Sequence, residues 1–147
     1  MLLRIPQGVS DGDMTTTAKK SLVVLGAGTA GTMVANKLRN RLPKNDWQIT
    51  VVDKNDVHYY QPGFLFIPFG MNTPEQVTKT KHAFIHDGNE LVLAEVDKVD
   101  PEARSVALMD GRTLPYDYLV IASGTSPRPD QTPGMLGDEW HKSVGEF

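Results

Sequence analysis

The stretch that decides the fold is SLVVLGAGTAGTMVANKLRNRLPKNDWQITVVD, residues 21–53. It begins with an apolar run at residues 22–25 and continues with the glycine-rich segment GAGTAG at residues 26–31. It ends with a second apolar run that terminates at Asp53. A GxGxxG motif alone is weak evidence, but here a strand pattern precedes it, a helical pattern follows it, and the acid comes about 20 residues later. This order predicts a βαβ unit that binds the diphosphate of a dinucleotide.

Each glycine of the motif has a physical reason. Gly26 allows a tight turn out of the first strand, Gly28 lets phosphate oxygens approach the backbone, and Gly31 lets the helix pack close to the strand. The helix would direct its free N–H groups and the positive end of its dipole at the diphosphate. Asp53 lies where a carboxylate accepts ribose hydroxyl protons. The plainer interpretation is an ordinary βαβ unit with a glycine-rich turn; because all the parts are in register, we expect dinucleotide binding.

Composition narrows the class of protein. The chain has 147 residues and a net charge of −3, which suits one domain with a hydrophobic core and argues against nucleic acid as a partner. No apolar stretch is long enough to span a bilayer, and no signal peptide is evident. The chain has no cysteine, which excludes a disulfide, a thiolate metal site and cysteine catalysis within it. We expect residues 1–20 to be a disordered extension and residues 21–147 to form the domain.

The segment after Asp53 looks irregular. Residues 64–69, FLFIPF, are strongly apolar but interrupted by a proline, which makes them a poor central strand. They would form a buried loop that fills the core, the wall of a ligand site, or a surface for a partner. Further on, Thr73, Pro74 and Gln76 predict the start of a helix, with Thr73 as N-cap and Gln76 completing a capping box.

The rest of the chain predicts mostly strands. Residues 90–99, 104–109 and 112–115 read as a small antiparallel meander, with Asp110 and Gly111 as a hairpin turn. Residues 118–122 then read as a buried core strand, residues 123–127 as a loop, and residues 139–147 as the start of a helix.

Two other kinds of site are not expected. His82 and His86 could face one side of a helix or strand, but they have no acidic or cysteine partner at metal-ligand spacing, so we expect no metal. Ser123 and Ser126 have no GxSxG frame, which argues against a hydrolase nucleophile.

Taken together, the motif at residues 23–31, Asp53, the meander and the segment DYLVIASGT at residues 117–125 resemble the flavoproteins with two dinucleotide-binding domains. In that superfamily a second motif is an apolar strand ending in Ala-Thr-Gly or a close variant; here it is Ala-Ser-Gly. Residues 56–63 and the apolar segment after them are most similar to the sulfide:quinone oxidoreductase and type II NADH dehydrogenase branch of the pyridine nucleotide-disulfide oxidoreductases. Between the two, residues 59–70 and 140–147 favour the sulfide:quinone type.

The resemblance implies a Rossmann-like α/β FAD-binding domain, a parallel sheet with a small antiparallel meander, incomplete at its C-terminus. It implies FAD as the cofactor, with the diphosphate at the glycine motif, Asp53 and Lys54 beside the adenosine ribose, and Val96 at the adenine. The residues it assigns to FAD are Gly26, Gly28, Thr29, Ala30, Gly31, Asp53, Lys54, Gln61, Pro62, Val96, Ala122, Ser123 and Gly124. Two departures matter: many FAD sites have glutamate at the position of Asp53, and the sulfide enzymes use cysteines, which are absent here.

We therefore interpret the chain as the FAD-binding fragment of a longer enzyme, inactive by itself, with the thiols and the quinone site downstream. The resemblance implies quinone and sulfide, or NADH, as partners of the intact protein. It also implies a cytoplasmic location with peripheral membrane association through the missing C-terminal region. An exposed sheet edge with apolar faces predicts self-association into a homo-oligomer.

Three other interpretations stay open. The first is an NADH:quinone or other NAD(P)H-dependent flavoprotein dehydrogenase, which a second complete GxGxxG motif downstream would favour. The second is a stand-alone NAD-binding module, which would bind NAD without flavin. The third is an interaction fragment built around residues 64–69, which would lose self-association with its aromatic side chains.

Overall fold

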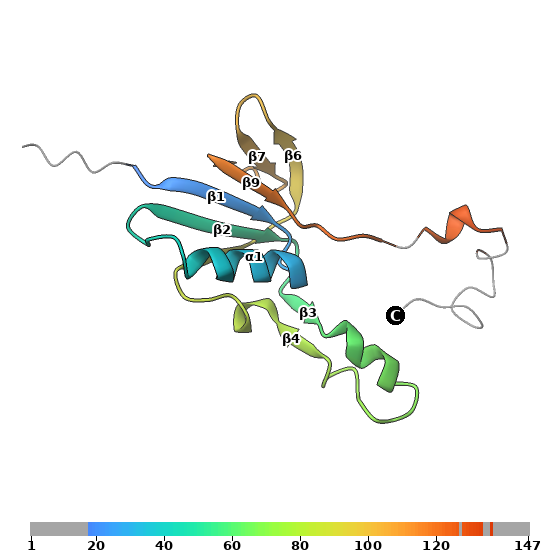
Figure 1. Cartoon of the computed structure of the whole chain (residues 1–147). Coiled ribbons are helices and arrows are strands. Elements are labelled where there is room, and N and C mark those ends of the chain that lie inside the picture. Colours follow the sequence, from blue (N-terminus) through green and yellow to red (C-terminus); the bar gives the residue numbers. More distant parts are fainter. Residues whose placement is uncertain (1–17, 127, 134–135, 137–147) are drawn as a thin grey trace, which may run out of the picture.

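A parallel sheet lies at the centre of the protein in the computed structural model, which describes residues 18–126, 128–133 and 136 (Figure 1). Its four strands, in the order β5-β2-β1-β9, are all parallel. They are β1 (Lys20–Leu25), β2 (Trp47–Asp53), β5 (Asn89–Leu93) and β9 (Tyr118–Ile121). Leu22 of β1 pairs with Ile49 of β2 and with Tyr118 of β9. The parallel register brings the carboxyl ends of the strands to one edge, which is where open α/β sheets bind ligands.

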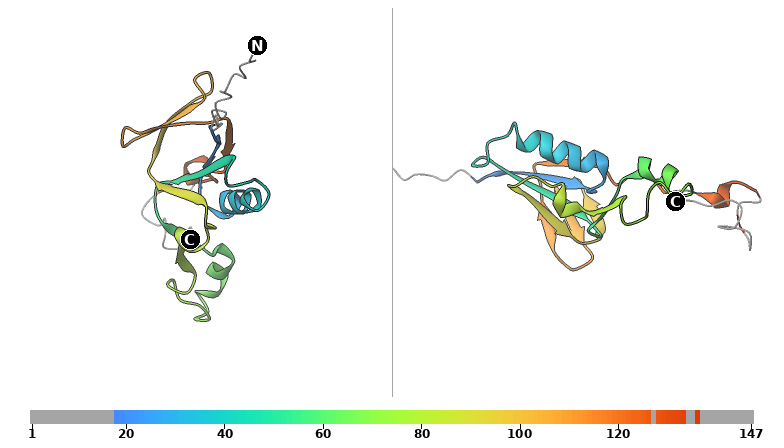
Figure 2. Two further views of the ribbon diagram at one scale, coloured as in Figure 1. Left: turned by 90° about the vertical axis from the view of Figure 1, so that its left-hand side faces the viewer. Right: turned by 90° about the horizontal axis from the view of Figure 1, so that it is seen from below.

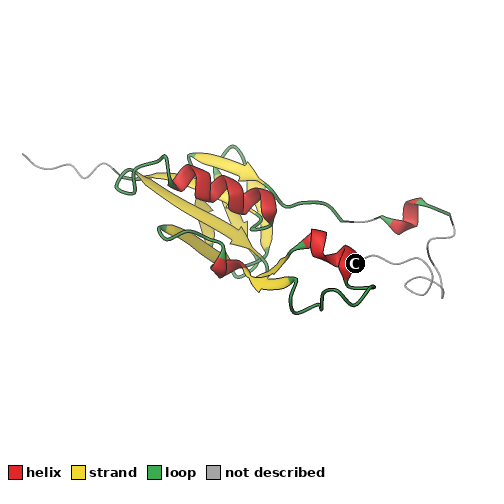
Figure 3. Ribbon diagram, turned by 60° about the horizontal axis from the view of Figure 1, so that its bottom comes forward, coloured by secondary structure: helices red, strands yellow, loops and turns green. Residues whose placement is uncertain are grey.

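Both faces of the sheet are covered, which explains why its strands read as continuous apolar runs. Leu22 and Val24 point to one face, beneath the helix α1 (Thr29–Arg39), and pack with Ile49 of β2. Val23 and Leu25 point to the other face and pack with residues of an antiparallel meander. The meander consists of β6 (Val96–Asp100), β7 (Ser105–Leu108) and β8 (Thr113–Pro115). Figures 2 and 3 show α1 and the meander on opposite sides of the sheet.

A second unit follows β2 and projects beyond the carboxyl end of the sheet (Figure 1). It contains β3 (Val57–Tyr59), the 3-10 helix η1 (Gln61–Phe66), β4 (Thr78–Thr80) and the 3-10 turn η2 (Lys81–Ala83). We call residues 54–83 the β3–β4 excursion, because β3 and β4 pair antiparallel with each other and not with the main sheet. Most of its large apolar side chains are exposed, and Val77 is its buried apolar anchor.

Several expectations are confirmed. The strand–helix–strand order of residues 21–53 is present, with β1 beginning at Lys20. The hairpin at Asp110 and Gly111 joins β7 to β8, and Gly111 has the positive φ of 88° that such a turn favours. A further 3-10 turn, η3 (Pro129–Gln131), follows the loop after β9. The helix expected at residues 139–147 lies outside the described residues.

The helix expected at Thr73 does not form. The capping-box bonds are both present: the Thr73 N–H donates to Gln76 Oε1 at 2.8 Å, and the Gln76 N–H donates to Thr73 Oγ1 at 3.4 Å. However, the backbone makes only a turn before β4 begins at Thr78. Pairing of β4 with β3 extends the chain after one turn, so tertiary structure overrides the local signal.

Three other expectations need correction. Only β6 and the strands after it form the meander, because residues 89–93 pair in parallel with β2 as β5. Strand β9 is not buried: it is an edge strand among the described residues, and Ile121 is 67% exposed. Residues 64–69 do not fill the core as a buried loop, since Phe69 is 76% exposed. Their two other interpretations, a ligand wall or a partner surface, stay open.

Among the described residues, no helix has the length and apolar character needed to cross a membrane.

Candidate functional site

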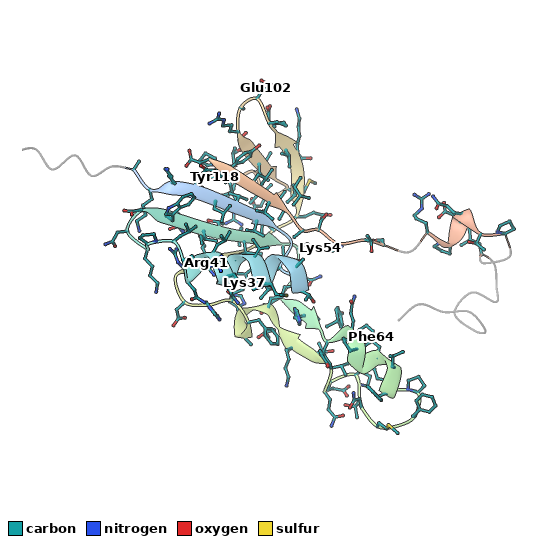
Figure 4. All side chains as sticks on the ribbon, viewed as in Figure 1. Lys37, Arg41, Lys54, Phe64, Glu102 and Tyr118 are labelled. Atoms are coloured by element: carbon teal, nitrogen blue, oxygen red, sulfur yellow. The ribbon has the colours of Figure 1, made fainter. Side chains whose placement is uncertain are left out.

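A groove of about 490 Å³ opens at the carboxyl edge of the sheet, between the start of α1 and the excursion. Residues from four segments that are distant in the sequence meet there: the turn after β1, the end of β2, the excursion, and the chain after β9. Figure 4 labels Lys54 at this edge and Phe64 further out in the excursion. The lining residues are Gly26, Gly28, Thr29, Ala30, Asp53, Lys54, Asn55, Val57, His58, Tyr59, Gln61, Lys81, Ala122, Ser123, Gly124 and Thr125.

The glycine turn is shaped by three different constraints. Gly26 has φ +100°, and a Cβ there would collide with the carbonyl oxygen of Ala122. A Cβ on Gly31 would collide with the carbonyl oxygen of Gly26, so the first turn of α1 packs directly on the turn that precedes it. Gly28 is different: a Cβ there meets nothing within 4 Å and would project into open space. Gly26 and Gly31 therefore build the turn, whereas Gly28 leaves the groove free.

The start of α1 faces this groove without a polar cap. Gly28 is the N-cap residue, no side chain in the described part of the chain caps the helix, and its first turn contains no acidic residue. Helices leave their first N–H groups without intrahelical partners, and the dipole gives that end a positive potential. Thr29 and Ala30 line the groove at this point, so the geometry favours a phosphate.

Asp53, at the end of β2, is held by two segments. Its Oδ2 accepts the N–H of Ala27 at 2.7 Å, and its Oδ1 lies 2.6 Å from Nζ of Lys81. Partial burial by itself would raise the pKa of Asp53, but hydrogen bonds from Lys81, Ala27 and Asn55 and the lysine charge together lower that pKa below 3.8. Asp53 is therefore an anchored carboxylate that closes the glycine turn.

Lys81 is a residue of the site that the sequence did not reveal. Its side chain is 7% exposed, and its partner Asp53 lies at the end of β2, just before the excursion begins. No local pattern marks it, because the contact depends on the antiparallel pairing of Val57 with Thr80. Only the tertiary structure of the excursion brings its ammonium group to the groove.

A second groove, of about 390 Å³, lies on the meander side of the same edge and shares Gly26, Asp53, Lys54 and Ser123 with the first. Its remaining lining is mostly apolar and comes from the sheet and from the meander. These residues are Leu25, Val52, Ala94, Glu95, Val96, Val99 and Ile121. Val96 was expected from the sequence, and the others were not. An apolar recess beside Asp53 suits a flat, weakly polar ring.

The structure gathers most of the expected site residues. Those lining one groove or both are Gly26, Gly28, Thr29, Ala30, Asp53, Lys54, Gln61, Val96, Ala122, Ser123 and Gly124. Gly31 is buried behind the turn and acts through packing. Pro62 is exposed in η1 and lines neither groove.

The histidines form a different contact from the one considered in the sequence. His82 Nδ1 lies 2.9 Å from Asp56 Oδ1, an exposed pair that links η2 to the chain before β3. Among the described residues, no group of three or more histidine, cysteine or carboxylate side chains is arranged to hold a metal ion.

Comparison with known proteins identifies the family to which the chain belongs. Residues 20–146 match the family model described as pyridine nucleotide-disulphide oxidoreductase. The chain belongs to this family. The chain is accordingly an FAD- or NAD(P)-binding domain of a flavoprotein oxidoreductase, and its α/β fold is the one expected for such a domain.

Individual relatives share between a quarter and a third of their length with the chain. It is 29% identical to the mitochondrial sulfide:quinone oxidoreductase of Dictyostelium discoideum over 140 residues, 90% of this chain and 31% of that protein. It is 32% identical to the type II NADH:quinone oxidoreductase of Staphylococcus haemolyticus over 107 residues, 72% of this chain and 26% of that protein. The crystal structure of the Aquifex aeolicus sulfide:quinone oxidoreductase superposes with a TM-score of 0.63 at 30% identity, covering 73% of this chain and 25% of that one.

Proposed function

We propose that the edge groove binds FAD, and that the chain is the FAD-binding segment of a flavoprotein oxidoreductase of the sulfide:quinone type. One observation carries the proposal: the open face of Gly28, the uncapped start of α1 and the Asp53 carboxylate line the same groove. A dinucleotide offers a diphosphate and a ribose at the spacing that this arrangement serves.

The residues present fit FAD. The backbone N–H groups of the first turn of α1, at Thr29 and Ala30, would hold the diphosphate, and Gly28 gives it room. Asp53 would accept a ribose hydroxyl, with Lys54 beside it. Val96 in the apolar recess would contact the adenine. Gln61 and the chain after β9, at Ala122, Ser123 and Gly124, also line the groove and would contact the rest of the cofactor.

Bound FAD would supply the chemistry, accepting an electron pair from the donor and passing it to the acceptor. This chain's residues would bind and orient the cofactor. The similarity to sulfide:quinone oxidoreductases supports sulfide as donor and quinone as acceptor of the whole protein. The similar identity to a type II NADH:quinone oxidoreductase supports NADH as the alternative donor. We expect the 147-residue chain alone not to turn over sulfide, since it contains no cysteine thiol to take up the sulfur.

The test is to titrate the purified chain with FAD, NAD and ADP, following flavin fluorescence and calorimetry. We expect saturable, one-to-one FAD binding that ADP displaces, with a perturbed flavin absorption band. Binding of NAD without FAD would instead favour a nicotinamide module. Failure to bind either nucleotide in a folded chain would contradict the proposal.

The donor requires a separate measurement on the whole protein. Reduction of its FAD by sulfide, but not by NADH, in a stopped-flow experiment would support the sulfide:quinone type. Reduction by NADH alone would favour the alternative.

A further inference from the structure

A buried lysine joins the β3–β4 excursion to the carboxyl edge of the sheet. The Nζ of Lys81 lies 2.6 Å from Oδ1 of Asp53, and it donates to the backbone oxygen of Asn55 at 2.8 Å and to Asn55 Oδ1 at 3.0 Å. An ammonium group has three N–H donors, so these three acceptors use all of them. Lys81 has no donor left for a ligand, and any effect it has on the groove passes through Asp53.

The register of the excursion specifies this position. Val57 pairs with Thr80, and the N–H of Lys81 donates to the backbone oxygen of Asp56 at 3.0 Å. Lys81 thus follows the pair that opens the hairpin and lies next to the chain leaving β2. A slip of one residue would turn its side chain to the opposite face and away from Asp53.

Asp53 connects Lys81 to the glycine turn, because its carboxylate contacts both. An ionised carboxylate offers about four acceptor positions. Lys81 and the N–H of Asn55, at 3.4 Å, use Oδ1, while the N–H of Ala27 uses one position on Oδ2. Among the contacts of the described residues, the acceptor position that stays open is therefore the second one on Oδ2, beside the glycine turn.

We propose that Lys81 is a positioning residue that fixes the Asp53 carboxylate so that its Oδ2 holds the glycine turn and accepts a single ribose hydroxyl of the bound nucleotide. This inference rests on the proposed function, because the ribose is that of the bound dinucleotide. It makes the excursion part of the nucleotide site through one side chain that never touches the ligand.

Of the charged and titratable residues described near Asp53, Lys81 is the one that contacts its carboxylate. Lys54 at the start of the excursion, His58 from β3 and Glu95 from the segment before β6 also line the grooves. Among the described side chains, however, only Lys81 comes within 4 Å of the Asp53 carboxylate as an ion-pair partner. Since burial opposes ionisation of Asp53 and the Lys81 contact favours it, removing the ammonium should raise the pKa of Asp53.

The first test needs no nucleotide. The amide of Ala27, which donates to Asp53, reports the ionisation of that carboxylate in an NMR pH titration. Wild type should show its midpoint below the ordinary value of an aspartate, and K81M and K81Q should shift it upward. K81R should stay near wild type, and K79M, on an exposed lysine of β4, is the matched control. An unchanged midpoint in both neutral variants would overturn the inference.

The second test separates positioning from a merely structural role. ADP and 2′,3′-dideoxy-ADP are compared at pH 7.5 and pH 5 in folded variants. Wild type, K79M and K81R should favour ADP by about tenfold at both pH values, as expected for a hydrogen bond to a charged group. In K81M and K81Q the preference for ADP at pH 7.5 should be smaller than in wild type. Between pH 7.5 and pH 5 it should fall further, by at least threefold. Two outcomes contradict the inference: equal losses of both affinities with the preference unchanged, or wild-type FAD binding without any preference for ADP.

The proposed function fails by a different result, namely a wild-type chain that binds neither FAD nor ADP. The two failures are therefore distinguishable.

Discussion

Two regions meet at the carboxyl edge of the sheet and are built in opposite ways. The β1–α1–β2 unit packs apolar side chains on both faces and leaves no room for a Cβ at Gly26 or Gly31. The β3–β4 excursion exposes Leu65 and Phe69 and is joined to the edge by polar contacts, of which the buried one is Lys81 with Asp53. The first region determines the shape of the groove through packing, whereas the second is positioned by a few charges. Substitutions should therefore have large effects in the first region and selective effects in the second.

The largest effect is expected for Gly31→Ala in the packed unit. The added methyl group would collide with the backbone oxygen of Gly26, which cannot move without opening the turn. We expect a loss of about 1–3 kcal/mol in the free energy of unfolding, together with loss of FAD binding. Urea denaturation and FAD titration measure the two effects. Unchanged stability would show that the turn is looser than this packing requires.

The matched control is Gly28→Ala, three residues earlier. A methyl group there meets nothing within 4 Å, so stability should stay within about 0.5 kcal/mol of wild type. The same methyl group projects toward the space assigned to the diphosphate, and FAD affinity should fall at least tenfold. Retention of wild-type FAD affinity would place the diphosphate elsewhere.

The contact between Asp53 and Lys81 should make the free energy of unfolding depend on pH in the acid range. Because the pKa of Asp53 is lowered in the folded protein, its ionised form adds stability above about pH 3.8, and this stability is lost as the pH falls through the folded pKa. Asp53→Asn removes this contribution, so the free energy of unfolding at neutral pH should fall. The difference from wild type, measured by urea denaturation, should shrink from pH 5 to pH 3. A difference independent of pH would mean that the carboxylate charge does not stabilise the fold.

The smallest effect on stability is expected for Phe69→Ser in the excursion. Its side chain is 76% exposed, so the free energy of unfolding should change by less than about 0.5 kcal/mol. If residues 64–69 form a partner surface, the same variant should reduce the self-association seen by analytical ultracentrifugation. A large loss of stability would show instead that this segment is buried against another part of the protein.

The two regions also differ in how far the sequence predicted them. The glycine turn and Asp53 were predictable because each residue stands at a fixed spacing from a strand end. Gly26 needs a positive φ, Gly31 allows a close approach, and Asp53 ends β2. The excursion was not. Lys81 meets Asp53 only through the pairing of β3 with β4, and the capping-box signal at Thr73 is overridden by the same pairing. The exposure of β9 and the parallel pairing of β5 likewise depend on neighbours distant in the sequence.

The central claim is that the glycine turn, Asp53 and the chain after β9 form one dinucleotide site. An NMR titration of the isotopically labelled 147-residue chain with FAD tests it most directly. We expect the largest amide shifts to cluster at Gly28, Thr29, Ala30, Ser123 and Gly124, with smaller shifts in the excursion near Lys81. Shifts centred on residues 64–69, or none at the glycine turn at saturating FAD, would contradict it.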